Sequence, residues 1–203
     1  MELRGFYFIT DSNLSHKPDV DVVREAVDGG CCVVQYREKN RQMEEMLRIA
    51  SKIRDLTRDK AYFIVNDNLD LALEAGADGI HLGQEDFSFR EARYVLGKDM
   101  IIGVTVHNVR EALDAEADGA DYLGVSPIFA TNTKPDAGLP AGVQLIRDVK
   151  SKVSIPVAAI GGINEANVDS VIAAGADMVC AISATVCKFD VKASVEYFSN
   201  KYL

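Results

Sequence analysis

The chain has 203 residues, enough for one compact domain with a sizeable core. Its formal net charge of −9 argues against a nucleic-acid-binding protein, because phosphate backbones select basic surfaces. No apolar run is long enough to cross a bilayer, and the first residues have no signal-peptide pattern. We therefore expect a cytoplasmic protein that binds neither membranes nor nucleic acid. Small phosphorylated ligands remain compatible with the charge, since backbone N–H groups, a few lysines and a metal ion can hold them.

Short apolar segments with strand character alternate with amphipathic segments along the whole chain. Most of the apolar segments lack two-residue alternation, which is typical of strands covered by helices on both faces. Apolar residues at helical spacing mark the segments between them, such as residues 43–56, 164–174 and 190–197. The expected strands are residues 6–10, 31–37, 61–67, 79–83, 100–107, 122–127, 155–162 and 178–185. Eight such units in so short a chain predict an α/β fold with a single (β/α)8 TIM barrel over residues 1–203, rather than an open doubly wound sheet.

A glycine-containing pattern recurs before every second expected strand. It is clearest at residues 75–80, 118–123 and 174–179, and a looser copy occupies residues 27–32. Each copy has glycine where a helix should end, and glycine accepts the left-handed conformation of a helix C-cap. We interpret the pattern as recurrent chemistry of the helix-to-strand loops, which fixes the phase between helix and strand.

The four cysteines form no C-x-x-C pair and have no zinc spacing with a histidine. Cys31, Cys32 and Cys180 lie in apolar segments, so we expect buried free thiols in a reducing compartment. His81 and His107 lie on expected strands outside any metal-spaced cluster. We interpret them as core or rim histidines with satisfied hydrogen bonds.

Polar residues collect where the expected strands end, which is the side on which barrel enzymes build their active sites. They include amides, hydroxyls, lysines and carboxylates. The stretches are Gln35-Tyr36-Arg37-Glu38-Lys39, Asn66-Asp67-Asn68, Gly83-Gln84-Glu85-Asp86, Thr105-Val106-His107, Thr131-Asn132-Thr133-Lys134, Gly161-Gly162 and Ile182-Ser183.

Asp67 and Asp86 follow neighbouring strands, so their carboxylates can converge. Two carboxylates with room for water and phosphate oxygens suit Mg²⁺. The alternative is that each aspartate caps a helix N-terminus, and position alone does not decide between the two.

Two loops have the composition of anion sites. Gly161-Gly162 follows an apolar strand and precedes a helix, where backbone N–H groups can cradle a phosphate. We favour this over a simple tight turn, because barrels often bind phosphate after strands seven and eight. The loop with Thr131, Asn132, Thr133 and Lys134 carries hydroxyls and a lysine, although a solvated surface loop stays open.

These stretches together resemble thiamine-phosphate synthase, a (β/α)8 family, over nearly the whole chain and in the same order. The resemblance is carried by Tyr7-Phe8-Ile9-Thr10-Asp11, Gln35-Tyr36-Arg37-Glu38-Lys39, Val65-Asn66-Asp67, His81-Leu82-Gly83-Gln84-Glu85-Asp86, Thr131-Asn132-Thr133-Lys134 and Ala159-Ile160-Gly161-Gly162-Ile163. The family joins hydroxymethylpyrimidine diphosphate to a thiazole phosphate, giving thiamine phosphate and pyrophosphate.

The resemblance implies a role for each matching residue. The pyrimidine diphosphate would be bound by Gln35, Arg37, Lys39, Asn66 and Lys134, with Thr105 near the pyrimidine and Asp67 and Asp86 holding Mg²⁺ against the diphosphate. The thiazole phosphate would be bound by Thr131, Thr133, Gly162, Ile182 and Ser183. Tyr36, Glu38 and Asn132 would complete the set of substrate-binding residues. Lys39, Lys134, Thr105 and Arg37 would be the catalytic residues.

Departures from the family pattern are mild. Thr105 stands where the family usually has serine, and the hydroxyl is retained. Asn68 replaces a common arginine, which affects diphosphate binding or helix packing. Ser126 and Ala130 replace glycine and proline in a loop, which changes its stiffness. None removes an expected metal or lysine residue.

Three other functions remain as alternatives. A thiazole tautomerase would share the thiazole-phosphate site but lack the diphosphate and metal residues that this chain retains. A sugar-phosphate isomerase or epimerase would need an acid/base pair, and no clear pair is visible. A non-catalytic ligand sensor would bind without turnover. The sequence leaves open whether the chain forms a homo-oligomer.

Overall fold

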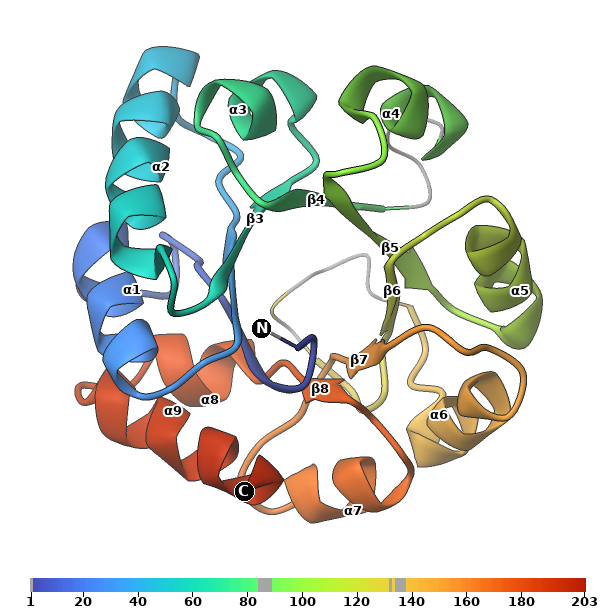
Figure 1. Ribbon diagram of the computed structural model, residues 1–203. Coiled ribbons are helices and arrows are strands. Elements are labelled where there is room, and N and C mark those ends of the chain that lie inside the picture. Colours follow the sequence, from blue (N-terminus) through green and yellow to red (C-terminus); the bar gives the residue numbers. More distant parts are fainter. Residues whose placement is uncertain (1, 84–88, 132, 134–137) are drawn as a thin grey trace.

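The computed structural model describes residues 2–83, 89–131, 133 and 138–203. Within these residues, eight parallel strands form a closed barrel in sequence order, and helices surround it (Figure 1). The strands are β1 (Gly5–Ile9), β2 (Val33–Tyr36), β3 (Tyr62–Asn66), β4 (Gly79–Leu82), β5 (Ile101–Val106), β6 (Tyr122–Val125), β7 (Val157–Ala159) and β8 (Met178–Val179). The predicted (β/α)8 barrel is therefore confirmed.

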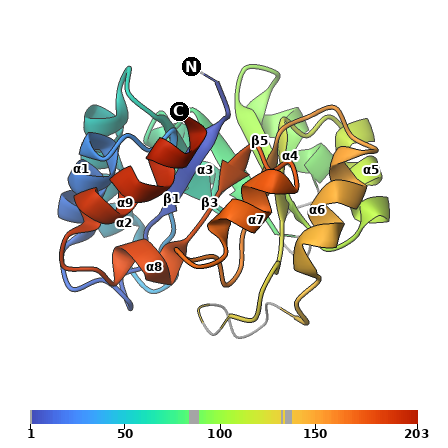
Figure 2. The same cartoon turned by 90° about the horizontal axis from the view of Figure 1, so that it is seen from below.

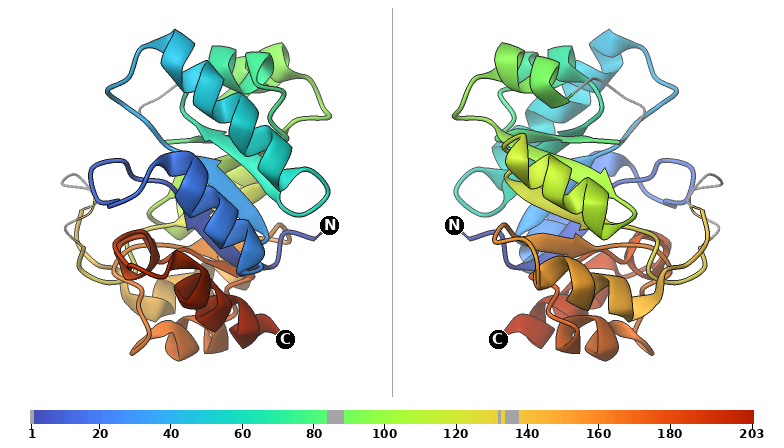
Figure 3. Two further views of the ribbon diagram at one scale, coloured as in Figure 1. Left: turned by 90° about the vertical axis from the view of Figure 1, so that its left-hand side faces the viewer. Right: turned by 90° about the vertical axis from the view of Figure 1, so that its right-hand side faces the viewer.

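The helices follow the strands in order around the ring. They are α1 (Asp19–Asp28), α2 (Met43–Thr57), α3 (Leu69–Glu74), α4 (Phe89–Leu96), α5 (Val109–Ala117), α6 (Gly142–Lys150), α7 (Val168–Ala173), α8 (Ile182–Val186) and α9 (Val191–Ser199), with a 3-10 turn η1 (Asn200–Tyr202). None of the helices described is long and apolar enough to cross a membrane. The N-terminal and C-terminal ends of the chain lie at the same end of the barrel (Figures 2 and 3).

One predicted strand is wrong at its end. The segment 178–185 was expected to be a single strand, but β8 ends at Val179 and residues Ile182–Val186 form the short helix α8. The segment is mostly apolar, and the structure buries most of it on both sides of the strand-to-helix junction, with Ser183 exposed. Ile182 and Ser183 therefore lie at the start of a helix rather than on a strand.

Side chains alternate between two cores along each strand. Tyr7, Val33, Ile64, Tyr122 and Met178 fill the barrel interior. Their neighbours on the strands, such as Phe6, Phe8, Val34 and Tyr36, pack between the barrel and the helices. Both faces of each strand are thus buried, which explains why the sequence shows little two-residue alternation of polarity.

The recurring glycine–aspartate pattern has a shared structural role. In all four copies the glycine has a left-handed φ: 83° at Gly30, 62° at Gly76, 95° at Gly119 and 100° at Gly175. This confirms the expected role at the helix ends. In three copies an aspartate lies two residues after this glycine, and its carboxylate makes two contacts. It accepts a hydrogen bond from a backbone N–H near the start of the preceding strand, and it pairs with a cationic side chain of α2, α4 or α6. The pairs are Asp78 with Phe63 N–H and Arg54, Asp121 with Ile102 N–H and Arg93, and Asp177 with Val157 N–H and Lys150.

Candidate active site

A cavity of about 590 Å³ opens at the C-terminal ends of the strands. Every strand or the loop after it contributes to the lining. The residues are Tyr7, Ile9, Gln35, Arg37, Lys39, Asn66, Asp67, His81, Gly83, Thr105, His107, Glu111, Gly124, Ser126, Thr131, Thr133, Ala158, Ile160, Gly161, Gly162, Ile163, Cys180, Ile182 and Ser183. The strand order thus brings together side chains that lie far apart in the sequence.

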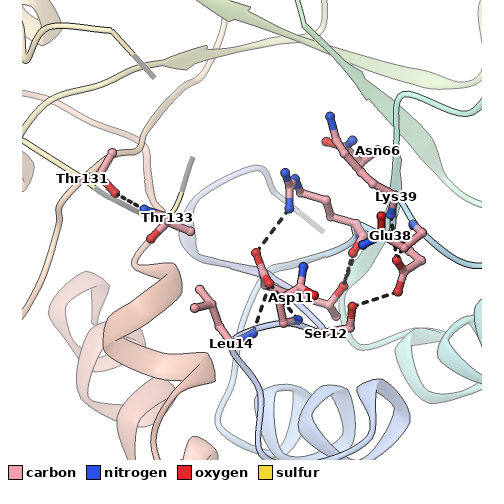
Figure 4. A network of polar contacts seen from close by, with 12 residues as sticks. Asp11, Ser12, Leu14, Glu38, Lys39, Asn66, Thr131 and Thr133 are labelled. Atoms are coloured by element: carbon pink, nitrogen blue, oxygen red, sulfur yellow. Dashed lines mark hydrogen bonds and ion pairs between the residues drawn. The ribbon is translucent and has the colours of Figure 1, made fainter. Parts of the chain in front are cut away.

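One side of the cavity carries two cationic side chains on the loop after β2. The Arg37 guanidinium lies 3.3 Å from the buried Asp11 carboxylate, measured from Nη1 to Oδ2. Asp11 also accepts hydrogen bonds from the backbone N–H groups of Asn13 and Leu14, which orient its carboxylate (Figure 4). The backbone N–H of Arg37 donates to Thr10 Oγ1 over 3.0 Å. The loop after β1 therefore fixes Arg37 in place, a role for Asp11 that sequence reasoning did not assign.

The second cation, Lys39, meets a polar pair at the end of β3. Its Nζ lies 3.8 Å from Asp67 Oδ2, and Asn66 Nδ2 donates to the same oxygen over 2.5 Å. Asp67 has a left-handed φ of 60°, which is uncommon for a residue with a side chain, and its N–H is held by the His81 carbonyl at 2.9 Å. Such backbone conformations concentrate at functional sites.

The structure tests the capping alternative for Asp67. Helix α3 has Asn68 as its N-cap, and the Asn68 side chain accepts a hydrogen bond from Leu71 N–H over 2.9 Å. The Asp67 carboxylate lines the cavity instead. Capping thus does not explain Asp67.

The opposite side of the cavity consists of glycines and hydroxyls. Gly161 and Gly162 have φ angles of 101° and 63°, and a Cβ on Gly162 would lie 2.4 Å from the carbonyl oxygen of Ala130. The turn therefore requires glycine twice over, for its backbone conformation and for the close approach of the loop after β6. Thr131, Thr133 and Ser183 also line the cavity. Figure 4 shows Thr131 and Thr133 across from Lys39 and Asn66.

Among the predicted binding residues that the structure describes, Tyr36 and Glu38 do not line the cavity. Tyr36 is buried between the barrel and the helices, where burial raises its pKa to about 12. Glu38 accepts hydrogen bonds from Ser12 Oγ and from the N–H groups of Lys39 and Asn40, and its carboxylate is 3.3 Å from Arg41 Nε. Strand alternation explains Tyr36, because it follows the cavity-lining Gln35 on β2 and faces the other way. Glu38 lies in the loop after β2, where these hydrogen bonds occupy its carboxylate.

Three predicted residues lie outside the described part of the chain: Asp86, Asn132 and Lys134. The remaining predicted residues line the cavity together. These are Gln35, Arg37, Lys39, Asn66, Asp67, Thr105, Thr131, Thr133, Gly162, Ile182 and Ser183.

The cavity is also lined by residues for which the sequence pattern predicts no binding role. Tyr7 and His81 lie at its base, and His107 lies at its rim with Nδ1 3.2 Å from Glu111 Oε2. The histidines were expected to be satisfied core or rim residues, and both have hydrogen-bond partners. A polar side chain facing inward on an apolar strand was the signal for Tyr7 and His81, but it does not reveal their partners.

The closed barrel and its cavity identify the protein as a (β/α)8-barrel enzyme whose site lies at the C-terminal ends of the strands. The family model described as thiamine monophosphate synthase matches residues 6–185. The thiamine-phosphate synthase of Methanosarcina barkeri is 51% identical over 193 residues, covering 95% of this chain and 88% of the relative. The thiamine-phosphate synthase of Methanospirillum hungatei is 46% identical over 201 residues, covering 97% of this chain and 96% of the relative.

A solved structure gives the same result. Thiamine phosphate pyrophosphorylase from Pyrococcus furiosus matches with a TM-score of 0.90 and 41% identity, covering 98% of this chain and 95% of that chain. The chain therefore belongs to the thiamine monophosphate synthase family. It is a transferase like these relatives.

Proposed function

We propose that this enzyme condenses 4-amino-2-methyl-5-hydroxymethylpyrimidine diphosphate with 4-methyl-5-(2-phosphoethyl)thiazole, releasing thiamine phosphate and pyrophosphate. The observation that carries the proposal is that one cavity has two different anion-binding sides. Arg37, Lys39 and Asn66 lie on one side, and the Gly161–Gly162 turn lies with hydroxyl groups on the other. Two phosphorylated substrates can thus be held with their reacting atoms facing each other, which lowers the entropic cost of the reaction.

The cationic side would take the diphosphate. Arg37 has a planar guanidinium held by Asp11, and such a group binds phosphate oxygens through two hydrogen bonds at once. Lys39 is half-exposed and its ammonium is within reach of Asp67, so it can follow the charge that develops on the leaving group. Lys134 would add a third cation, by resemblance to the family.

The residues on this side fit Mg²⁺. Asp67 places a carboxylate in a cavity that would otherwise be suited to anions, and a carboxylate would repel a diphosphate unless a cation lay between them. Carboxylate, water and phosphate oxygens are the ligands that Mg²⁺ prefers. Asp67 would hold the ion together with Asp86, and the bound ion would neutralise charge on the diphosphate.

The chemistry needs positioning and charge stabilisation more than proton transfer. The bond between the exocyclic methylene carbon and the diphosphate oxygen breaks, and its electron pair leaves with pyrophosphate. The electron-rich aminopyrimidine stabilises the resulting cation. The lone pair of the thiazole nitrogen then forms the new C–N bond. This nitrogen carries no proton, so no general base is needed. Arg37, Lys39 and Lys134 would stabilise the departing pyrophosphate.

The glycine side would anchor the thiazole phosphate. The loops after strands seven and eight, together with a short extra helix, form the usual phosphate site of this fold. In this chain the corresponding elements are the Gly161–Gly162 turn and α8, whose residues Ile182 and Ser183 line the cavity. Thr131 and Thr133 would add hydroxyl and backbone donors.

The test is a two-substrate assay with the pure protein. Pyrophosphate and thiamine phosphate are measured together after incubation with both substrates and Mg²⁺. We expect equal amounts of the two products, and loss of both when EDTA removes the metal. Lys39→Ala should lower kcat/KM by about 10²–10³-fold, the usual effect of losing one group that stabilises transition-state charge. Asp67→Asn and Lys134→Ala should also lower it sharply.

Lys52→Ala is the matched control, because Lys52 is an exposed lysine on α2 outside the cavity, and it should keep wild-type kinetics. A folded protein that binds the thiazole phosphate and makes no product would contradict the proposal. Conversion of a thiazole tautomer without the pyrimidine substrate would favour a tautomerase, and tight binding without any turnover would favour a sensor.

A further inference from the structure

A continuous line of hydrogen bonds crosses the barrel interior at the base of the cavity. Gln35 Nε2 donates to Tyr7 Oη over 2.8 Å, and the Tyr7 and Tyr122 hydroxyls are 2.7 Å apart. Tyr122 Oη is 2.9 Å from His81 Nδ1, and His81 Nε2 is 2.9 Å from Thr105 Oγ1. We call these five residues the interior chain. Four of them line the cavity, whereas Tyr122 is fully buried and does not.

Two glycines make room for the interior chain. A Cβ on Gly103 of β5 would lie 2.0 Å from Cζ of Tyr122, and a Cβ on Gly124 of β6 would lie 2.9 Å from Cε1 of His81. No side chain larger than hydrogen fits at Gly103 while the Tyr122 ring stays where it is. The rings of Tyr122 and His81 also contact each other, with centroids 5.5 Å apart. The sequence thus reserves space on two strands for the rings that connect Gln35 with Thr105.

The chemistry of the links favours one direction for the hydrogen bonds of the interior chain. A phenol has one proton to donate, and burial raises the pKa of both Tyr7 and Tyr122 far above the usual range, so each keeps that proton. Tyr7 accepts from Gln35, so its one proton is available for the link to Tyr122. If Tyr122 in turn donates to His81 Nδ1, an imidazole with one N–H carries that proton on Nε2, and Thr105 Oγ1 accepts it. The Thr105 hydroxyl then acts as a donor through its own proton. The distances do not assign the donor in these links, and this direction is the part of the proposal that the first experiment below tests.

We propose that the interior chain is a specificity device: it fixes Thr105 as a hydrogen-bond donor and Gln35 Oε1 as an acceptor at the base of the cavity, and so selects a ring that offers an amino donor beside a nitrogen acceptor. The proposal rests on the proposed function, because the 4-aminopyrimidine edge has this pattern. The 4-oxo counterpart, in its lactam form, carries the reverse pattern, an acceptor oxygen beside an N–H donor. Tyr122 is a positioning residue, since it acts on the substrate only through its neighbours.

The first experiment reads the direction of the interior chain without substrate or activity. Nitrogen-15 NMR of the free protein with labelled histidine distinguishes the protonated from the unprotonated ring nitrogen of His81, assigned with a His81→Gln variant. We expect the proton on Nε2 and an unprotonated Nδ1 near neutral pH. Tyr122→Phe should remove this preference and give a mixture of tautomers. A proton on Nδ1 in the wild-type protein, or on both nitrogens, would overturn the proposal.

The second experiment measures selectivity between the 4-amino and 4-oxo pyrimidine diphosphates. Tyr122→Phe removes one hydroxyl and leaves the cavity lining unchanged. We expect the ratio of kcat/KM values for the two substrates to fall by about tenfold, the usual effect of losing one well-placed buried hydrogen bond. The fall should come mainly from a higher KM for the amino substrate. Thr105→Val, which removes the hydroxyl, should reduce this ratio of kcat/KM values. Thr105→Ser, which keeps the hydroxyl, should leave the ratio near the wild-type value.

Tyr202→Phe is the matched control, because the Tyr202 hydroxyl donates to the Ala176 carbonyl on the far side of the barrel. It should leave both the tautomer and the selectivity unchanged. An unaltered ratio in folded Tyr122→Phe protein would sink the proposal, and Tyr7→Phe offers a second break in the interior chain if Tyr122→Phe does not fold. If the protein made no product from either pyrimidine, the proposed function would be wrong. The NMR measurement of the His81 tautomer would still test the direction of the interior chain.

Discussion

Two glycines with nearly the same φ differ in their surroundings, one at the cavity and one at the end of a helix. Gly162 has a φ of 63° and Gly76 a φ of 62°. A Cβ on Gly76 would meet no atom within 4 Å, whereas a Cβ on Gly162 would press on the Ala130 carbonyl oxygen at 2.4 Å. Both alanine variants should lose about 1–2 kcal/mol of unfolding free energy to the left-handed backbone. Only Gly162→Ala should also raise the KM for the thiazole phosphate, by roughly tenfold or more, because it displaces the loop after β6.

The measurement pairs urea unfolding with steady-state kinetics on both variants. The KM for the pyrimidine diphosphate serves as the internal control, since Gly162 lies on the opposite side of the cavity from Arg37 and Lys39. If the thiazole KM rose equally in Gly76→Ala, the cause would be general loosening of the barrel. If it did not rise in Gly162→Ala, the turn would not be the phosphate anchor.

Part of the candidate site could be predicted from the sequence, residue by residue. The sequence predicts that polar residues at the strand ends lie together, because a parallel barrel places all these ends on one side. Of the predicted residues that the structure describes, all except Tyr36 and Glu38 line one cavity. Strand alternation could also have separated Gln35 from Tyr36. The partnership of Tyr7 with Tyr122 could not be predicted, because the two residues are 115 positions apart and meet only when the barrel closes.

At the scale of elements, the loop between β2 and α2 is organised around Glu38. Burial raises the pKa of this carboxyl, but hydrogen bonds from Asn40 N–H, Ser12 Oγ and Lys39 N–H, together with the charge of Arg41, outweigh burial and lower the pKa below its ordinary value. A carboxyl whose pKa is lowered by folding stabilises the protein above the pKa of the unfolded chain. This contribution is lost as the pH falls through the folded pKa. Acid should therefore loosen the loop that carries Lys39.

This pH dependence is measurable through the free energy of urea unfolding between pH 7 and pH 3. Wild-type protein should be more stable than Glu38→Gln at pH 7, and the difference should shrink as the pH falls below about 4.3, the ordinary value for glutamate. Glu196→Gln, which changes an exposed glutamate on α9, should follow the wild-type curve throughout. A constant difference between wild type and Glu38→Gln would mean that the charge of Glu38 does not stabilise the loop.

The bounds of the helices and strands were predicted best where an amphipathic helix adjoins a strand. The expected helix at 43–56 agrees with α2 (Met43–Thr57), and every strand falls within its predicted segment except β1, which begins one residue earlier at Gly5. The error at the end of β8 has a physical cause. Residues 178–185 are almost uniformly apolar, and a short buried strand followed by a short buried helix has no periodicity that would show the boundary.

At the scale of the whole molecule, the barrel closes across its shortest strand. Only two residue pairs join β1 to β8, Gly5 with Met178 and Phe6 with Val179, compared with four between β2 and β3. Helix α9 covers this junction. Its Phe198 is fully buried and stacks on Phe6 with ring centroids 5.1 Å apart. Packing of α9 therefore substitutes for the backbone hydrogen bonds that a longer β8 would supply.

This arrangement predicts that the closure depends on Phe198. Phe198→Ala should lower the free energy of unfolding by about 3–5 kcal/mol, as for other buried phenylalanines, and speed amide exchange at the β1–β8 junction more than at β2–β3. Phe189→Ala is the matched control, because the Phe189 side chain is 88% exposed just before α9, and it should be nearly neutral. Under conditions where Phe198→Ala stays folded, kcat and KM should not change, because Phe6 and Phe198 pack on the outer face of β1 while Tyr7 faces the cavity. Uniformly faster exchange at both junctions would instead mean that the barrel opens as one cooperative unit, without a weak point at β8.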